Sequence, residues 1–294
     1  MKNGYATGED MLGTGAVAID DSVAPVRLLY GASDHLLGLA QRVGAGVPIQ
    51  LTPQAPAMWA FPRVVKTLAV SRPPSPKAGT LWAVDDDCNV WNETAPRSEQ
   101  MSPLVRLNAS DAGFSAAEFH SVAAVDGRVY ISLAGTSAGP ALHAVAADGT
   151  TVSTHPLPKD AQPQFIQGIA ADDSYVYFLD FSSGYIMRIA FADFGTAGKE
   201  AQVVKVAGDD ATTHDIAVDD HCLYRAGYHP TMPGNYALLA CDKETTFSCV
   251  VVKDLGPSID HAFIHGLAAD ARGLFYTVTE TDGKNQVCVV QRGP

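Results

Sequence analysis

A six-residue pattern reads His265-Gly266-Leu267-Ala268-Ala269-Asp270, and related copies recur along the whole chain. The five earlier copies begin at Gly15, Lys66, His120, Gln167 and His214. The third position of each copy is a branched aliphatic residue, and the fourth is always alanine. Successive copies start 51, 54, 47, 47 and 51 residues apart. Self-similarity at such a period is typical of repeat architectures, so the chain contains one structural unit repeated six times.

Each repeat predicts four short strands. In the fullest copy we expect them at 167–172, 175–179, 185–189 and 201–206, joined by turns rich in Gly, Asp and Ser. No segment shows a sustained 3.6-residue apolar period, so almost no helix is expected. Units of four strands at this period are the signature of a β-propeller. We therefore predict an all-β fold, a six-bladed β-propeller with four-stranded antiparallel blades that start near residues 15, 66, 120, 167, 214 and 265.

The repeated alanine has a steric explanation. The first strand of each blade is innermost, where the blades converge and little space remains for side chains. We predict one propeller domain over residues 1–294. The last repeat supplies only three strands, so we expect the N-terminal segment, within residues 5–12, to complete it. The proline-rich segment from Pro53 to Pro62 is expected to be an irregular loop.

Composition narrows the class of protein. Apolar residues make up 47% of the 294 residues and charged residues 18%, an ordinary globular balance. The net charge of −12 argues against nucleic acid or an anionic membrane as partner, because both are polyanions. No stretch approaches the roughly 18 apolar residues that span a bilayer. Residues 1–15 contain one lysine and no apolar core, so they do not read as a signal peptide. We expect a monomer.

The five cysteines leave two readings open. Their number is odd and no CxxC is present, which excludes a zinc ribbon or a thioredoxin motif. Cys241 and Cys249 flank a short predicted loop. They either bridge a hairpin or remain buried thiols that act as small apolar residues.

The first position of the pattern is where we expect chemistry. Because these residues open the innermost strands, they should lie together at one mouth of the central channel. Three of them are histidines, namely His120, His214 and His265. Imidazoles that converge in this way form a ligand set for Zn²⁺ or a similar divalent metal, with one position left for water or substrate. Alternatively, the three histidines satisfy loop carbonyls or hold water in the channel.

Other polar residues are predicted on the same face. Glu118 precedes His120 by two residues and is assigned as general base, the alternative being a solvated loop carboxylate. Lys66 is assigned as a catalytic cation that stabilises an oxyanion, the alternative being a cation that pairs with local acids. Residues expected to contact substrate or to support the ligands are Gln167, His35, Tyr228, His229 and His261.

Acidic turns receive a different interpretation. Asp172-Asp173 and Asp219-Asp220 are placed on the opposite face as ordinary β-turn residues. A calcium site at Asp85-Asp86-Asp87 is the least favoured reading, because that segment lacks a spaced acidic ligand motif.

The run from Gly168 to Phe178 (GIAADDSYVYF) resembles the NHL and YWTD-like six-bladed propellers, and the resemblance covers roughly residues 15–292. It implies an extracellular or periplasmic location, since the similar bacterial proteins are secreted. The mouth histidines resemble those of peptidyl-α-hydroxyglycine α-amidating lyase, which holds zinc with three histidines at the propeller axis. The Glu118 and His120 pair resembles the axial glutamate and histidine of streptogramin lyase, a seven-bladed relative that uses a divalent metal.

The sequence departs from these relatives in some respects. The blade number differs from that of streptogramin lyase, and the other catalytic residues of the amidating lyase are not found by pattern. The first position also lacks the Glu, Asn and Asp ligands of gluconolactonase-like propellers. The predicted function is a metal-dependent lyase or hydrolase acting on a small ester, lactone or amide-like substrate at the channel mouth. The alternative is a non-catalytic propeller that binds a ligand or protein partner through the same loop-rich face.

Overall fold

The computed structural model is built almost entirely of β-strands, with one short 3₁₀ helix, η1 (Phe191–Asp193), among the described residues. The residues that it describes are 4–6, 17–20, 27–33, 36–43, 50–60, 65–71, 80–85, 89–93, 103–106, 114–125, 128–136, 141–146, 152–156, 166–180, 185–199, 202–204, 215–243, 248–257, 261–270, 273–280 and 285–291. No helix in these ranges is long and apolar enough to cross a lipid bilayer.

The described strands form six four-stranded antiparallel sheets, which we number 1 to 6 by their innermost strands. Sheet 1 contains β2 (Val17–Asp20), β3 (Arg27–Ser33), β4 (Leu36–Val43) and β5 (Gln50–Ala60). Sheet 2 contains β6 (Val65–Val70), β7 (Leu81–Asp85), β8 (Asn89–Glu93) and β9 (Pro103–Arg106). Sheet 3 contains β10 (Phe114–Val125), β11 (Arg128–Thr136), β12 (Ala141–Ala146) and β13 (Val152–Pro156).

The second half of the chain repeats this arrangement. Sheet 4 contains β14 (Ile166–Ala171), β15 (Tyr175–Asp180), β16 (Ile186–Ala190) and β17 (Gln202–Val204). Sheet 5 contains β18 (Ile216–Val218), β19 (Cys222–Tyr228), β20 (Asn235–Asp242) and β21 (Cys249–Pro257). Sheet 6 contains β22 (His261–Asp270), β23 (Gly273–Glu280), β24 (Asn285–Gln291) and, beside β24, the N-terminal strand β1 (Gly4–Ala6).

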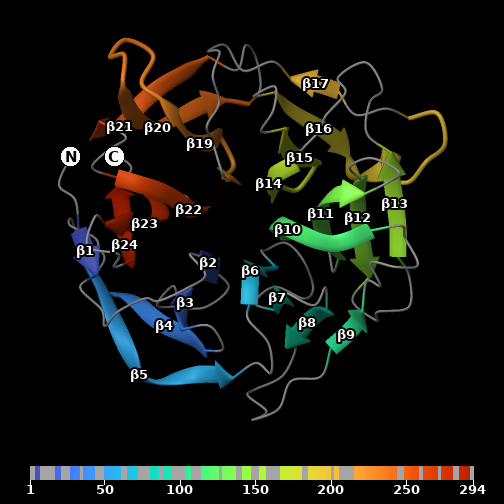
Figure 1. Ribbon diagram of the computed structural model, residues 1–294, viewed down its shortest axis with the longest axis horizontal. Helices are drawn as coiled ribbons and strands as arrows, with labels where there is room; N and C mark the ends of the chain where they lie inside the picture. The colour runs from blue at the N-terminus through green and yellow to red at the C-terminus, as the bar shows by residue number, and fades with distance from the viewer. Residues whose placement is uncertain are drawn as a thin grey trace.

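The sheets are arranged in a ring around a central axis (Figure 1). Their innermost strands contact one another in the order β2, β6, β10, β14, β18 and β22, and β22 contacts β2 again. The chain termini meet in sheet 6, where β1 pairs with β24 so that Tyr5 lies opposite Cys288. The architecture is that of a β-propeller, and the predicted fold class is confirmed.

The repeated sequence pattern forms the wall of the axis. The third, fourth and fifth residues of all six copies line a central cavity of about 90 Å³, and their side chains are all aliphatic. The fourth-position alanine has a large partner on the second strand of its sheet. The residues paired with these alanines are Leu29, Trp82, Tyr130, Tyr177, Tyr224 and Phe275. A small residue near the axis is thus combined with a bulky one farther out, as the taper of each sheet requires.

Neighbouring innermost strands run side by side at the same level. A Cβ added to Gly168 would lie 2.9 Å from the backbone nitrogen of Ile216, so only glycine fits at this contact between β14 and β18. In the next interface, Oδ2 of Asp215 accepts a hydrogen bond from the backbone N–H of Leu267 at 2.8 Å. Equivalent pattern positions in adjacent sheets therefore lie at equivalent heights along the axis.

The Pro53–Pro62 prediction was wrong for most of its length. Residues 50–60 form β5, which pairs only with β4 in sheet 1 and is the outermost strand there. Proline is tolerated on an edge strand because an N–H that points outward needs no partner in the sheet. The pairing of β5 is also irregular between Gln54 and Trp59, which frees the residues around Pro56 from the ladder.

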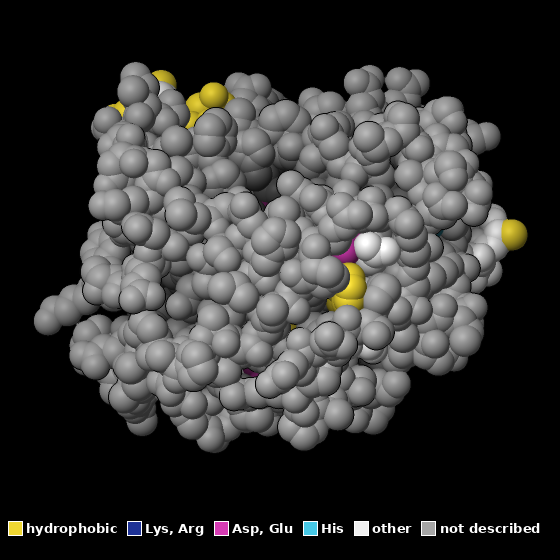
Figure 2. All heavy atoms as spheres, turned by 60° about the horizontal axis from the view of Figure 1, so that its bottom comes forward, with side chains coloured by type: hydrophobic (Ala, Val, Ile, Leu, Met, Phe, Trp, Pro, Cys, Tyr) yellow, Lys and Arg dark blue, Asp and Glu magenta, His cyan; other side chains and the backbone are white. Residues whose placement is uncertain are grey.

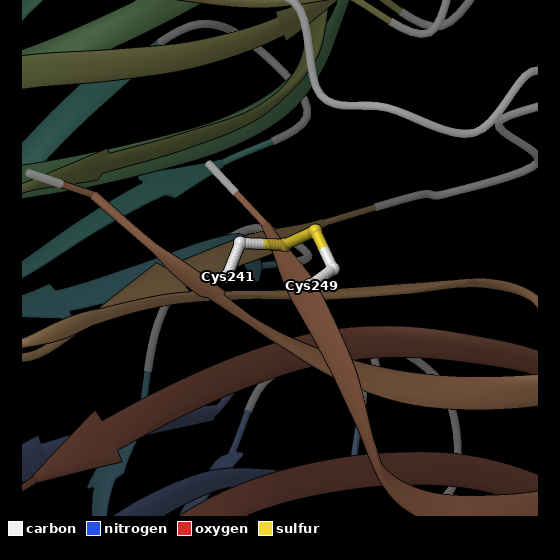
Figure 3. Close-up of a disulfide and its surroundings, with 2 residues drawn as sticks. All are labelled: Cys241 and Cys249. Carbon is white, nitrogen blue, oxygen red and sulfur yellow. A yellow bond between two sulfur atoms is a disulfide. The ribbon is translucent and has the colours of Figure 1, made fainter. Parts of the chain in front are cut away.

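A disulfide joins Cys241 to Cys249, which are directly paired residues of β20 and β21 (Figure 3). The sequence left open a bridged hairpin or two buried thiols, and the structure shows the bridged hairpin. Cys222 is half-buried and takes no part in this disulfide.

Candidate functional site

The first position of the sequence pattern coincides with a β-bulge. In β6, β14 and β22 the pairing with the second strand skips one residue, and the skipped residues are Lys66, Gln167 and His265. In β10 the shift falls at His120 and Ser121, which together oppose a single residue of β11. A bulge releases a residue from the regular alternation of the strand and turns its side chain in a new direction. The first pattern position therefore lies in a bulge, outside the regular strand pairing, in four sheets.

These bulges lie at one end of the central cavity. Each precedes, by two residues or fewer, the third-position aliphatic that lines the cavity wall. Because equivalent positions of neighbouring strands are level, Lys66, His120, Gln167 and His265 belong to one mouth of the channel, which we call the bulge mouth. His214 is expected at the same level by its place in the pattern, but it lies outside the described residues.

The other predicted site residues are distributed as follows. Glu118 and His261 had been expected in connections that enter the mouth, yet the structure places both within strands, since β10 and β22 extend beyond the pattern. Glu118 pairs with Ala134, and His261 pairs with Glu280. His35 lies outside the described residues.

The metal prediction rests on side chains that the structure does not describe, namely those of His120, His214 and His265. The same holds for the side chains of Glu118, Lys66, Gln167 and His261. Within the described part of the chain, no group of three His, Cys, Asp or Glu residues could hold a metal ion.

Tyr228 and His229 belong to an ordered turn between β19 and β20, which we call the rim loop (residues 228–236). Strand β19 runs antiparallel to β18, and Tyr228 lies three residues beyond Arg225, the partner of Ile216. The rim loop therefore projects at the bulge mouth. The Tyr228 ring lies against that of Tyr236, with centroids 4.9 Å apart.

Hydrogen bonds fix the conformation of the rim loop. The backbone N–H of His229 donates to the carbonyl of Asn235 at 2.8 Å, and that of Asn235 donates to the carbonyl of Met232 at 3.1 Å. The backbone N–H of Thr231 donates to Nδ1 of His229 at 3.2 Å, which leaves the hydrogen of the neutral imidazole on Nε2. Gly234 has φ of 85°, a conformation that favours glycine.

The rim loop exposes large apolar side chains. Tyr228 is 39% exposed and Met232 is 47% exposed. On the face shown in Figure 2, the described hydrophobic side chains reach the surface in a few places, with neighbouring patches at the upper left. Tyr236 was not among the predicted site residues. It could have been found from the sequence, because the expected hairpin of strands 222–228 and 236–241 places Tyr236 opposite Tyr228.

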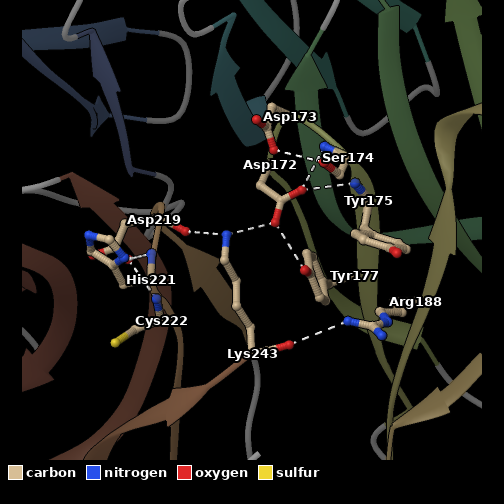
Figure 4. A network of polar contacts seen from close by, with 10 residues as sticks. All are labelled: Asp172, Asp173, Ser174, Tyr175, Tyr177, Arg188, Asp219, His221, Cys222 and Lys243. Atoms are coloured by element: carbon tan, nitrogen blue, oxygen red, sulfur yellow. Dashed lines mark hydrogen bonds and ion pairs between the residues drawn. The ribbon is translucent and has the colours of Figure 1, made fainter. Parts of the chain in front are cut away.

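The opposite mouth carries a polar network that serves the fold (Figure 4). Oδ1 of Asp172 accepts the backbone N–H groups of Ser174 and Tyr175, and Oδ2 accepts the hydroxyl of Tyr177 and Nζ of Lys243. Asp219 repeats the turn contacts with His221 and Cys222 and accepts the hydroxyl of Tyr224. The interpretation of these aspartates as turn residues agrees with the geometry. Lys243, which donates to both Asp172 and Asp219, was not identified from the sequence.

Asp85 also has a structural role. Its carboxylate is fully buried and accepts hydrogen bonds from the backbone N–H of Asn89, the Asn89 amide and the Trp91 indole, at 2.7–2.9 Å. These contacts make it a turn-stabilising group. Asp86 and Asp87 lie outside the described residues.

Comparisons with known proteins identify the fold. The chain matches no protein-family model and no curated protein. A crystal structure of a nidogen/laminin complex is similar with a TM-score of 0.59 at 12% identity, covering 84% of this chain and 83% of that one. A putative TolB from Agrobacterium tumefaciens gives 0.58 at 10% identity, with 95% and 90% covered. YCF48 bound to a D1 peptide gives 0.51 at 9% identity, with 99% and 83% covered. At such identities the likeness supports the β-propeller fold alone.

Proposed function

We propose that this propeller is a binding protein that takes a peptide segment of a protein partner on the rim loop at the bulge mouth. The observation that carries the proposal is the exposed Tyr228 ring, which lies against the half-buried ring of Tyr236, with Met232 exposed on the same loop. Tyrosine and methionine are enriched in protein interfaces, and aromatic anchors supply much of the binding energy there.

The order of the rim loop strengthens this proposal. Its backbone is closed by hydrogen bonds at His229 and Asn235 before any partner is present. A recognition element that is already ordered loses less conformational entropy when it binds. The His229 ring, with its hydrogen on Nε2, adds a polar donor beside the apolar surface, as a specific interface needs.

The similar structures support the same class of function. Two of them are complexes, one of nidogen with laminin and one of YCF48 with a D1 peptide. The Cys241–Cys249 disulfide suits an oxidising compartment, which supports an extracellular or periplasmic location.

The test uses the full chain and a library of random peptides displayed on phage. Selected peptides are synthesised, and their affinities for the parent protein and for Tyr228→Ala are compared. Truncation of an aromatic anchor should weaken binding by about tenfold or more. Val250→Ala is the matched control, because Val250 is 64% exposed but lies in β21, outside the rim loop. Peptides that bind Tyr228→Ala as tightly as the parent would exclude the rim loop as the binding site.

A second candidate function is the metal-dependent lyase or hydrolase acting on a small ester, lactone or amide-like substrate. The observation that favours it is the bulge at the first pattern position, since bulges are over-represented next to active sites. The donor set fits a divalent ion such as Zn²⁺ by its chemistry, with His120, His214 and His265 as the ligands. Such an ion would polarise a substrate carbonyl or acidify a bound water.

In this second candidate the chain's own residues have distinct tasks. Glu118 would accept the proton as general base, Lys66 would stabilise negative charge, and Gln167 would orient the substrate. His35, Tyr228, His229 and His261 would contact it from the surrounding face. Metal content of the purified full chain tests the assignment, with one equivalent of metal expected. Less than one equivalent, unchanged when the three ligand histidines are replaced by alanine, would rule out this site.

A further inference from the structure

The interface between sheets 4 and 5 contains two buried cations with different surroundings. Lys243, at the end away from the bulge mouth, donates 2.7 Å hydrogen bonds to the carboxylate of Asp172 and to the carbonyl of Asp219. The other cation is Arg225 in β19, which is only 4% exposed. The positive charge of Lys243 is thus compensated by a carboxylate and a carbonyl oxygen within the interface.

Arg225 faces apolar side chains. Its paired neighbours are Ile216 on β18 and Leu239 on β20, and directly paired residues share one face of a sheet. Both neighbours belong to the apolar cluster that joins sheet 5 to Leu179 and Ile186 of sheet 4. The guanidinium is thus held in the interface between the two sheets.

Nothing in the described part of the chain offsets this charge. The Nε atom of Arg225 is buried and has no hydrogen-bond partner. Burial lowers the pKa of the guanidinium. An unpaired charge in an apolar environment is unfavourable, and such groups in folded proteins are normally paired.

Along its own strand, Arg225 has a side chain as next neighbour on one side only. On the axis side, Gly168 lies directly against the backbone of Ile216 and closes the wall. Away from the bulge mouth, the next side chain on the same face of β19 is Leu223, which is fully buried. Toward the mouth, the next residue on that face is Gly227, which has no side chain. On strand β19 itself, therefore, no side chain separates Arg225 from the bulge mouth.

We propose that Arg225 is the anchor of an oxyanion site at the bulge-mouth end of the interface between sheets 4 and 5. The planar guanidinium suits a carboxylate or phosphate group of a ligand, because it donates two parallel hydrogen bonds to either. The bound anion would supply the countercharge that the described residues lack at this place. The site is separate from the rim loop, since Tyr236 packs against the cluster between sheets 5 and 6, on the other face of sheet 5.

The test follows thermal unfolding of the full chain with inorganic phosphate or acetate as the probe, and with chloride at matched ionic strength. For the parent protein, the midpoint should rise by about 2–5 °C as the effective anion saturates its site. Arg225→Met should unfold at the same temperature as the parent or higher without anion, because it removes an unpaired buried charge, and it should not respond to the anion. Arg128→Met is the matched control, since Arg128 is an exposed arginine at the start of the equivalent strand β11.

The choice of anion identifies the ligand class. Stabilisation by phosphate alone assigns a phosphate-bearing ligand, and stabilisation by acetate assigns a carboxylate. An equal response of the parent and Arg225→Met, or no response of the parent, overturns the site. A midpoint for Arg225→Met well below that of the parent without anion also overturns it, because the guanidinium would then be paired within the protein. Arg225→Lys keeps the charge and should retain a weaker response. Peptide binding at the rim loop can succeed or fail independently of these results.

Discussion

The Nζ atom of Lys243 donates a 2.7 Å hydrogen bond to Oδ2 of Asp172 and so joins sheet 5 to sheet 4. Both side chains are 10% exposed or less. Burial by itself raises the pKa of Asp172, but the hydrogen bonds from Lys243 and from the backbone N–H groups of Ser174 and Tyr175 outweigh it and lower the pKa below its ordinary value. The carboxylate is therefore charged at neutral pH and depends on its partners.

Lys243→Met should reduce the free energy of unfolding by about 3 kcal/mol, because it leaves the buried Asp172 carboxylate without its cation. This value lies at the lower end of the range for breaking a buried ion pair, because Asp172 keeps its hydrogen bonds from the Tyr177 hydroxyl and from two backbone N–H groups. Urea unfolding at neutral pH measures it. Lys199→Met is the control, because its ion pair with Asp193 is exposed and is worth about 0–1 kcal/mol. Similar losses in both variants would contradict the assigned role of Lys243.

The stability difference between the parent and Lys243→Met should shrink in acid. A carboxyl group with a lowered folded-state pKa contributes stability above its unfolded pKa, near 4, and this contribution is lost as pH falls through the folded value. Urea unfolding repeated at successively lower pH should show the two proteins converging below about pH 4. A difference that stays constant into strong acid would mean that the charge of Asp172 is not what the lysine stabilises.

His143 predicts a second, separate acid effect. Burial lowers the pKa of this imidazole to about 4. The unfolded chain takes up the proton near pH 6.5, so stability should fall as pH decreases from there toward 4. The fall should be on the order of 3 kcal/mol, since one pKa unit corresponds to about 1.4 kcal/mol. His143→Gln should remove this part of the pH dependence of stability. The variant should still lose some stability in acid, because burial also lowers the pKa of His155. An unchanged slope in His143→Gln would show that His143 does not contribute.

Strand positions and ring order were predictable because each repeat carries its own complete signal. The alanine positions line the axis, as expected from the crowding of the innermost strands, and the aliphatic positions line it beside them. The bulges at Lys66, Gln167 and His265 were not predictable, because a bulge is defined by the pairing of two strands and leaves no mark in one of them. The Lys243–Asp172 pair, 71 residues apart, had no local signal either.

The Cys241–Cys249 disulfide should stabilise sheet 5. It closes a loop of eight residues between β20 and β21, for which the chain-entropy estimate is about 2–3 kcal/mol. Cys241→Ser/Cys249→Ser should lose about this much stability, and the parent protein should lose it when a reductant is added. Urea unfolding with and without reductant measures both effects. Cys222→Ala, which removes a cysteine outside this disulfide, should respond to reductant as the parent does. Insensitivity of the parent to reductant would contradict the prediction.

Gly168→Ala should separate two innermost strands. The new Cβ would lie 2.9 Å from the nitrogen of Ile216 and 3.1 Å from Cα of Asp215, and neither backbone atom can rotate away as a side chain can. Overpacking of this kind costs about 1–3 kcal/mol. Amide hydrogen exchange offers a local measurement, because the backbone N–H of Ile216 is held by Oδ1 of Asp215 and that of Leu267 by Oδ2.

In Gly168→Ala both amides should exchange faster, since a displaced Asp215 loosens its bonds to β18 and β22. Gly198→Ala is the comparison, because a Cβ there has open space around it and the positive φ alone costs about 1 kcal/mol. It should leave the exchange of Ile216 and Leu267 unchanged. Equal effects of the two substitutions on these amides would show that β14 and β18 are not in close contact at Gly168.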